Sequence, residues 1–258
     1  MNNEKPLKEF YANKLKVKIF PDRELMGVAA ALEVAEKIKK LQRLKKEINM
    51  IFAAAPSQNE LLEELTAIKE IEFSGITAFH MDEYVGLGEE APQRFGNFLY
   101  EKLFGKAKFK QVHYINPSEQ NPEEECRRYA SLLDKVSVDI VCMGIGENGH
   151  IAFNDPPFAD FADPRLVKVV ELDEKSRNQQ VHDGCFDSLN KVPKKAITLT
   201  IPVLFNADFI FCVVPGNTKA EAVKETLKGR IDSNCPASVL RMHSNATLFL
   251  DVESAKYL

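Results

Sequence analysis

The chain has 258 residues, of which 45% are hydrophobic and 28% are charged, a composition typical of a globular protein with a large core. Its net charge of -4 excludes a broad positive field for nucleic acid or an anionic membrane, so an anionic ligand must be held locally. No apolar run approaches the roughly 20 residues that span a bilayer. The polar start and five cysteines without metal-type spacing predict a cytoplasmic protein with reduced thiols.

Apolar runs typical of buried strands alternate with helical patterns along the chain. Strands are expected at residues 14–20, 48–55, 76–81, 136–143, 166–172, 196–201, 209–214 and 247–251. Helices are expected at about 22–46, after a capping box at 57–60, and at 93–104, 122–133 and 217–228. The alternation predicts an α/β fold with a single doubly wound, mainly parallel sheet flanked by helices, in a Rossmann-like arrangement. We expect one domain over residues 1–258, with the polar segment at about 156–193 forming a flap.

Ligands of such folds bind in the crevice outside the carboxyl ends of the strands. The loops at 53–58, 81–88, 144–157 and 215–219 all follow expected strands. We therefore expect these four loops to converge on one site, and the candidate functional residues come from them.

The sequence GIGENGHIAFNDPP at 144–157 offers the clearest chemistry of the chain. His150 can transfer protons near neutral pH, and Asn148 or Asp155 can orient its ring. Gly146 and Gly149 leave room for a ligand near the backbone. The same pattern also fits a glycine-bent turn that carries an ordinary structural histidine.

Two carboxylates, Asp82 and Glu83, follow the expected strand at 76–81. Adjacent side chains on a strand point to opposite sides, so only one of the two can face the site. A carboxylate in a closed pocket can have a raised pKa and serve as a base. Two solvated carboxylates at a strand end are the alternative.

Two strand-to-helix turns can bind phosphate through amides at a helix N-terminus. Ser57 lies in the first, which is alanine-rich and also fits an ordinary capped helix. Lys219 lies in the second, where its charge opposes the helix dipole and suggests an anionic ligand; a surface lysine is the alternative. The chain has no Walker loop, no GxGxxG after the first strand and no HExxH, so we expect no nucleotide cofactor and no metal.

Together these motifs resemble the glucosamine-6-phosphate deaminase (isomerase) family. The matching pieces occur in family order and cover nearly the whole chain: MDEYVGL at 81–87, PQ at 92–93, GIGENGHIAFND at 144–155, VPKKAITLTI at 192–201, PGNTKA at 215–220 and SVLRMH at 238–243. The related 6-phosphogluconolactonases share the fold and a GxGxxGH loop. They typically continue with a TASLFP-like segment, whereas this chain has IAFN at 151–154, which favours the deaminase branch.

The resemblance implies conversion of glucosamine 6-phosphate into fructose 6-phosphate and ammonia, without a metal or a redox cofactor. It implies that Asp82 carries the C2 proton to C1, that His150 assists opening of the sugar ring, and that Lys219 holds the phosphate. It also implies that Asn148 and Asp155 orient the histidine. Further substrate contacts are expected from Ser57, Glu83, Gly146 and Gly149.

The chain departs from the family pattern mainly where phosphate is expected to bind. The usual TGxTP loop is replaced by AAPSQ at 54–58, and the flap has DGCF at 183–186 where an arginine normally precedes a Phe-Phe pair. Arg177, His182 and Arg241 are the expected replacements. Asp155 stands where many members have glutamate, and Asn148 where many have aspartate. These departures indicate a divergent subgroup, for which galactosamine 6-phosphate is a natural alternative substrate.

Two other functions fit the same fold: a lactonase-type hydrolase and a non-catalytic sugar-phosphate sensor. Asp82 together with His150 argues against the sensor, which needs no proton-transfer pair. The expected partner is a small-molecule sugar phosphate, with no nucleic acid and no membrane. The family includes monomers and oligomers, so a homo-oligomer is compatible with the resemblance.

Overall fold

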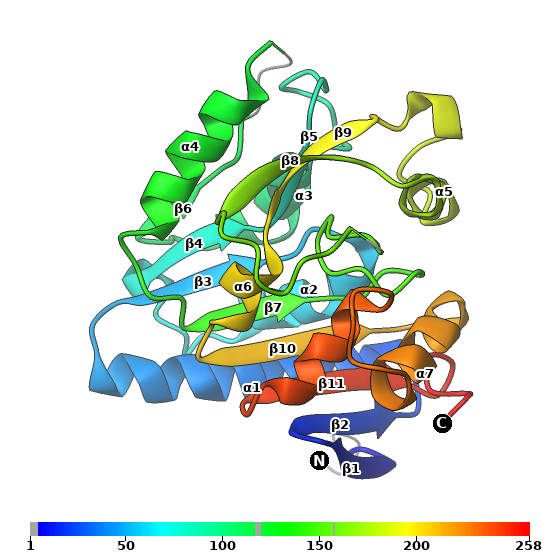
Figure 1. The fold of residues 1–258 in the computed structure, drawn as a ribbon. Helices are drawn as coiled ribbons and strands as arrows, with labels where there is room; N and C mark the ends of the chain where they lie inside the picture. The colour runs from blue at the N-terminus through cyan, green and yellow to red at the C-terminus, as the bar shows by residue number, and fades with distance from the viewer. Residues whose placement is uncertain (1–4, 117–119, 157) are drawn as a thin grey trace.

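The computed structural model describes residues 5–116, 120–156 and 158–258, so Pro157 at the end of the glycine-rich motif lies outside the described residues. Over these residues, the main sheet has eight strands in the order β1-β2-β11-β10-β7-β3-β4-β6 (Figure 1). The strands are β1 (Lys8–Ala12), β2 (Leu15–Phe20), β3 (Ile48–Phe52), β4 (Ile76–His80), β6 (Gln111–His113), β7 (Ile140–Met143), β10 (Phe209–Val214) and β11 (Ala246–Asp251). Every neighbouring pair is parallel except β1 with β2, which confirms the expected mainly parallel sheet.

Helices cover both faces of the main sheet, because apolar side chains alternate between its two sides along each strand. In β3, Met50 and Phe52 face one helix layer and Ile51 faces the other. The first layer contains α1 (Arg23–Leu44), α2 (Asn59–Ala67) and α3 (Phe95–Leu99). The second layer contains α4 (Pro122–Leu133), α6 (Ile201–Phe205) and α7 (Ala220–Lys228). The expected doubly wound arrangement is confirmed.

A second, three-stranded sheet was not expected. It consists of the antiparallel strands β5 (Asp82–Tyr84), β9 (Lys195–Leu199) and β8 (Val167–Glu171), in that order. The expectation of a single sheet is wrong, because the apolar runs at 166–172 and 196–201 form β8 and β9, which pair with each other, and β9 also pairs with β5. Only Met81 separates β4 from β5, so the chain passes directly from the main sheet into the small one.

The segment 156–193, expected to form a flap, contains strand β8 and a helix after it. Helix α5 (Glu174–His182) follows β8 and precedes β9. Figure 1 shows α5 at the same end of the molecule as α7, where the parallel strands of the main sheet end. This position brings a polar helix over the end of the sheet at which ligands of such folds bind.

The start of α2 differs from the expected capping box. Ser57 lies in a 3-10 turn over Pro56–Gln58, and α2 begins at Asn59 without a side-chain cap. The Glu60 carboxylate does not reach back to the helix start, because it accepts hydrogen bonds from Arg23 at 2.7 and 2.9 Å. The strand expected at 48–55 also ends at Phe52, which leaves residues 53–55 to the loop before Ser57.

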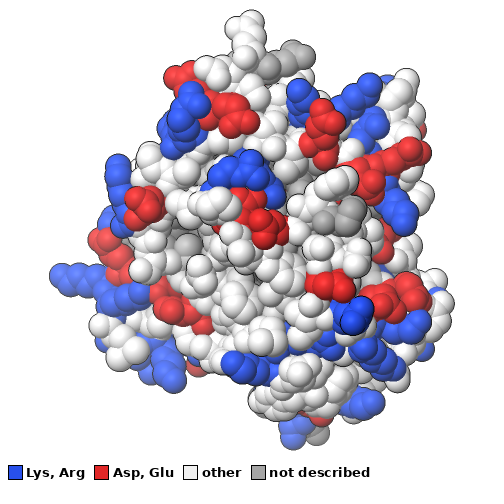
Figure 2. Space-filling view, viewed as in Figure 1, with Lys and Arg blue, Asp and Glu red and all other residues white. Residues whose placement is uncertain are grey.

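Other elements were partly or wholly unexpected. The sequence did not predict β1, β5, β6, α5 or α6, whereas the long helix α1 and the cores of the expected strands were placed correctly. The short helical elements are Phe73–Gly75, Leu189–Lys191, Asn217–Lys219, Pro236–Met242 and a π-helix at Tyr100–Phe104 that continues α3. Within the described ranges, no helix has the length and apolar character needed to cross a membrane. Figure 2 shows acidic and basic side chains interspersed over one face, as the small net charge predicts.

Candidate active site

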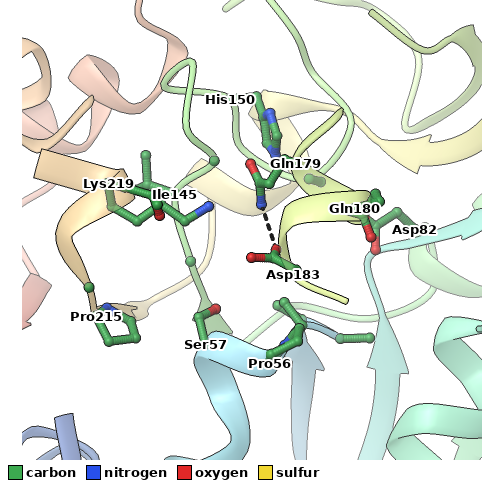
Figure 3. Close-up of a pocket in the computed structure, with 18 of the residues that line it drawn as sticks. Pro56, Ser57, Asp82, Ile145, His150, Gln179, Gln180, Asp183, Pro215 and Lys219 are labelled. Atoms are coloured by element: carbon green, nitrogen blue, oxygen red, sulfur yellow. Dashed lines mark hydrogen bonds between the residues drawn. The ribbon is translucent and has the colours of Figure 1, made fainter. Parts of the chain in front are cut away.

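The strand-end loops meet around one cavity of about 250 Å³ (Figure 3). The cavity-lining residues from these loops include Ala53–Ser57, Met81, Asp82, Gly144–Gly146, His150 and Pro215–Lys219. The expected convergence is therefore confirmed, although the loop at 81–88 contributes only its first two residues. Helix α5 and the residue that follows it add three polar groups to the same wall, namely Gln179, Gln180 and Asp183.

Asp82 brings a buried carboxyl group to the cavity wall, with 6% of the residue exposed. Burial raises its pKa well above the ordinary value, and the nearby Glu83 carboxylate raises it further. The backbone of Asp82 is fixed by His80, whose Nδ1 lies 2.9 Å from the Asp82 carbonyl oxygen. The Ile115 amide donates to the other ring nitrogen at 2.8 Å, so Nδ1 carries the proton. Burial lowers the pKa of His80 to about 4, which keeps this ring neutral at physiological pH.

Glu83 faces away from the cavity, as the alternation of side chains along a strand requires. Its Oε1 accepts hydrogen bonds from the amides of Tyr84 and Phe95 at 2.9 and 3.1 Å, and its Oε2 accepts one from Gly96 at 2.9 Å. The expectation that Glu83 contacts substrate is wrong, because its oxygens satisfy the first amides of α3. The side chain instead ties β5 to the start of this helix.

His150 belongs to a buried network of polar side chains. Its Nδ1 lies 3.1 Å from Asp155 Oδ1 and 2.9 Å from the Ser176 hydroxyl. Asn148 accepts a hydrogen bond from the His150 amide at 3.1 Å and donates one to Asp155 at 3.1 Å. Burial alone would raise the pKa of Asp155, but hydrogen bonds from His150, Ser176 and Asn148 outweigh it and hold that pKa at about 2. The histidine therefore faces an ionised carboxylate, while neither Asn148 nor Asp155 lines the cavity itself.

The two glycines of the loop have different roles. A Cβ atom at Gly146 would lie 2.1 Å from His150 Cε1 and 2.2 Å from Nε2, so the imidazole occupies the space that a side chain would take. Gly149 has a φ of +84° and a Cβ there would lie 2.8 Å from Cys235 Sγ. Gly146 lines the cavity and Gly149 does not. The expectation of a substrate contact at Gly149 is wrong, because this residue forms the turn and packs away from the site.

The opposite end of the cavity holds the groups that can bind an anion. Lys219 is 5% exposed and lines the cavity together with Ser57 and Arg23. Burial lowers the pKa of Lys219, and the nearby carboxylates of Asp183 and Glu147 partly oppose this shift. Figure 3 shows the Lys219 ammonium and the Asp183 carboxylate both pointing into the cavity. The Asp183 carboxylate thus lines the same cavity as Lys219 and as Arg23, which is ion-paired with Glu60.

The expected replacements for the missing flap arginine do not line the cavity. Arg177 donates to the carbonyl oxygens of Leu189 and Val192 at 2.6 and 3.0 Å. Arg241 donates to the carbonyl oxygens at 227 and 229 at 3.0 and 2.6 Å. His182 is largely exposed and lies 3.4 Å from a carboxylate oxygen of residue 147. All three expectations are wrong, because these side chains are engaged by the protein outside the cavity.

Sequence reasoning missed several groups of the site. Ser176 and the cavity-facing side chains of α5 lie in a polar stretch without any apolar periodicity, so no pattern indicated which of them point inward. Arg23 had a usable signal, because it is the first residue of a helix that follows a strand of the parallel sheet. Among the described residues, no cluster of three or more histidine, cysteine or acidic side chains could hold a metal ion.

Comparisons with known proteins show the family of the chain. Residues 21–249 match the family model described as glucosamine-6-phosphate isomerases/6-phosphogluconolactonase. A glucosamine-6-phosphate deaminase of Listeria monocytogenes serotype 4b is 36% identical over 242 residues, covering 93% of this chain and 99% of that protein. One from Thermoanaerobacter sp. is 35% identical over 234 residues, covering 88% and 90%.

Solved structures give the same picture at the level of the fold. A structure described as a monomeric glucosamine-6-phosphate deaminase superposes with a TM-score of 0.85 at 30% identity, covering 94% of this chain and 99% of that one. A 6-phosphogluconolactonase from Trypanosoma brucei has a TM-score of 0.80 at 16% identity, covering 95% and 99%. At that identity, the second likeness concerns the fold alone.

Proposed function

The chain belongs to the family of glucosamine-6-phosphate isomerases and 6-phosphogluconolactonases, and on this basis we propose that it converts glucosamine 6-phosphate and water into fructose 6-phosphate and ammonia. The observation that carries the proposal is that Asp82 and His150 line the same cavity. An aldose–ketose shift needs one group that moves a proton between adjacent carbons and a second that assists ring opening.

Asp82 is the proposed base for the proton shift. In the open-chain aldose, its carboxylate removes the proton from C2 and returns it to C1, while one amino proton passes to O1; the 2-amino aldehyde thereby becomes a 2-imino alcohol. Water then hydrolyses the imine to the ketone and ammonia. The raised pKa of Asp82 suits this task, because a carboxyl group that holds a proton more strongly is a better base once ionised.

His150 is the proposed acid–base group for ring opening. Opening a pyranose moves a proton from the C1 hydroxyl to the ring oxygen. An imidazole can accept a proton from the hydroxyl and donate one to the ring oxygen. Asp155 and Asn148 are proposed to fix the ring, since both hydrogen-bond to the His150 residue or to its partner. Lys219 and Ser57 are proposed to hold the phosphate, with Gly146 leaving room for the sugar.

The segment 156–193 is proposed to act as a flap within a single domain. Its helix α5 supplies one wall of the cavity, so substrate entry would require this wall to move. We further propose that the enzyme works in the cytoplasm with its cysteines reduced. We propose a monomer rather than the homo-oligomer considered above, because the similar deaminase structure is described as monomeric.

The proposal is tested by measuring ammonia release from glucosamine 6-phosphate and galactosamine 6-phosphate, alongside hydrolysis of 6-phosphogluconolactone. We expect ammonia release from at least one amino sugar and no lactone hydrolysis above the spontaneous rate. Lactone hydrolysis without ammonia release would instead establish the lactonase alternative. The panel also decides the configuration at C4 that the site accepts.

Asp82→Asn separates catalysis from binding in the same assay. Loss of a general base lowers turnover by about 10² to 10⁴-fold, while the amide keeps the size of the side chain and therefore the fold. Binding of the sugar phosphate, measured by calorimetry, should stay within a few fold of wild type. Turnover comparable to wild type would remove Asp82 as the base.

A further inference from the structure

Helix α5 contributes to the acid–base network as well as to the cavity wall. Ser176, 1% exposed, places its hydroxyl 2.9 Å from His150 Nδ1 and donates a hydrogen bond to Asp155 Oδ1. It also lies 3.4 Å from the Asn148 amide nitrogen. The hydroxyl is therefore in contact with the histidine ring and with both residues that orient it, although it belongs to a different part of the chain.

The direction of these hydrogen bonds follows from which atoms carry a hydrogen. His150 Nδ1 lies 3.1 Å from an ionised Asp155 oxygen, so a hydrogen must stand between the two atoms and Nδ1 is protonated. Ser176 then has no lone pair to donate to at Nδ1, so its single hydrogen goes to Asp155 and its oxygen accepts from the imidazole. Whenever the ring is neutral, Nε2 is its unprotonated atom and can accept a proton from the sugar.

Two further contacts join α5 to the loop that carries His150. The Glu147 amide donates to the side-chain oxygen of Gln179 at 2.8 Å. The Glu147 carboxylate lies 3.4 Å from His182 Nδ1. Ser176, Gln179 and His182 are spaced by three residues along the helix, so one face of α5 rests on this loop. Gln180 and Asp183, next to that face, line the cavity.

We propose that Ser176 is a positioning residue for His150, and that docking of α5 onto the cavity completes the acid–base unit. This inference rests on the proposed function and extends it. Asp155 sets the proton on Nδ1, and the movement that closes the wall around the sugar also brings the Ser176 hydroxyl against Nδ1 to hold the ring in place. Ring opening is then efficient only when the cavity is closed. Proton transfer by Asp82 does not depend on Ser176, because Asp82 is held by β5, β9 and His80.

The direct test is Ser176→Ala, with Lys175→Ala as the matched control. Alanine favours a helix and leaves no void larger than a hydroxyl, whereas Lys175 is an exposed neighbour on the same helix. We expect kcat to fall roughly 10- to 100-fold in Ser176→Ala, the range for losing a hydrogen bond to a charged group, and to stay unchanged in the control. Retention of kcat within twofold in an active enzyme would overturn the inference.

Two measurements distinguish positioning from a merely structural role. The acyclic analogue 2-amino-2-deoxyglucitol 6-phosphate needs no ring opening, so its dissociation constant should be unchanged in Ser176→Ala; weaker binding would indicate damage to the cavity. With substrate deuterated at C2, the isotope effect on kcat should fall or remain at unity, because slower ring opening masks the proton shift. A larger isotope effect would place Ser176 at the Asp82 step and contradict the inference.

A spectroscopic test does not depend on turnover. Nitrogen-15 spectra of labelled histidine, with the His150 signals assigned through His150→Gln, should show a protonated Nδ1 whose hydrogen exchanges slowly in wild type. That exchange should be at least tenfold faster in Ser176→Ala. Equal exchange in both proteins would refute the role of Ser176 even if no amino-sugar phosphate were a substrate, whereas absence of ammonia release alone would refute only the proposed function.

Discussion

Gly146→Ala should disable the catalytic histidine by steric contact alone. The residue has no positive φ, so alanine fits the backbone, but its Cβ would lie 2.1 Å from His150 Cε1. Ordinary van der Waals contact begins at 3.4 Å, so the ring has to retreat by about 1.3 Å. A misplacement of about 1 Å can cost about 100-fold in rate, or about 2.7 kcal/mol of barrier. We expect kcat/KM for ammonia release to fall by at least that factor.

The matched control is Gly88→Ala, where an added Cβ meets nothing within 4 Å. This variant should keep wild-type kinetics, and both variants should unfold cooperatively, as judged by circular dichroism. If folded Gly146→Ala retained more than about a third of wild-type kcat/KM, the position of the His150 ring would not matter for turnover. That result would contradict the assignment of His150 as the acid–base group for ring opening.

Three further predictions concern the charged groups. Lys219→Ala should raise KM more than it lowers kcat, because holding the phosphate is largely uniform binding; an unchanged KM would count against that role. Asp183→Asn should lower the inhibition constant of inorganic phosphate by about three- to tenfold at low salt, because a negative charge near the anion is removed. A higher inhibition constant would show that Asp183 assists binding. Because the pKa of Asp155 is depressed to about 2 from 3.8, its stabilisation of about 2 kcal/mol is present above about pH 4 and is lost as the pH falls toward 2. Urea titrations between pH 6 and pH 3 should therefore show a smaller loss of stability in Asp155→Asn than in wild type, and equal losses would refute this.

The strand ends of the main sheet were predictable from sequence because two independent signals coincide there. An apolar run marks each strand, and the residues that follow it lie at the same edge of a parallel sheet. This logic predicts that Asp82, His150 and Lys219 lie around one cavity, and all three line it. The network behind the histidine was only half predictable, since Asn148 and Asp155 lie near it in sequence and Ser176 does not.

The failures share a physical cause, which is that a side chain's type does not give its direction. Arg177 and Arg241 carry the charge that a phosphate site needs, but nearby backbone carbonyls engage both. Glu83 has the chemistry of a site residue, but its carboxylate accepts hydrogen bonds from the backbone amides of Tyr84 and of the start of α3. Helix α5 has no apolar stripe, so its position depends on polar contacts to a distant loop that no local pattern encodes.

The direct passage from β4 through Met81 into β5 has a consequence for the response of the enzyme to heat. Asp82 lies where the main sheet joins the small one, and the backbone hydrogen bonds of sheets are among the last to open on warming. Helix α5, in contrast, contacts the loop that carries His150 through side chains. Thermal loosening should begin at the helix. We expect turnover to decline reversibly at temperatures below the melting transition, and to recover on cooling without refolding of the sheets.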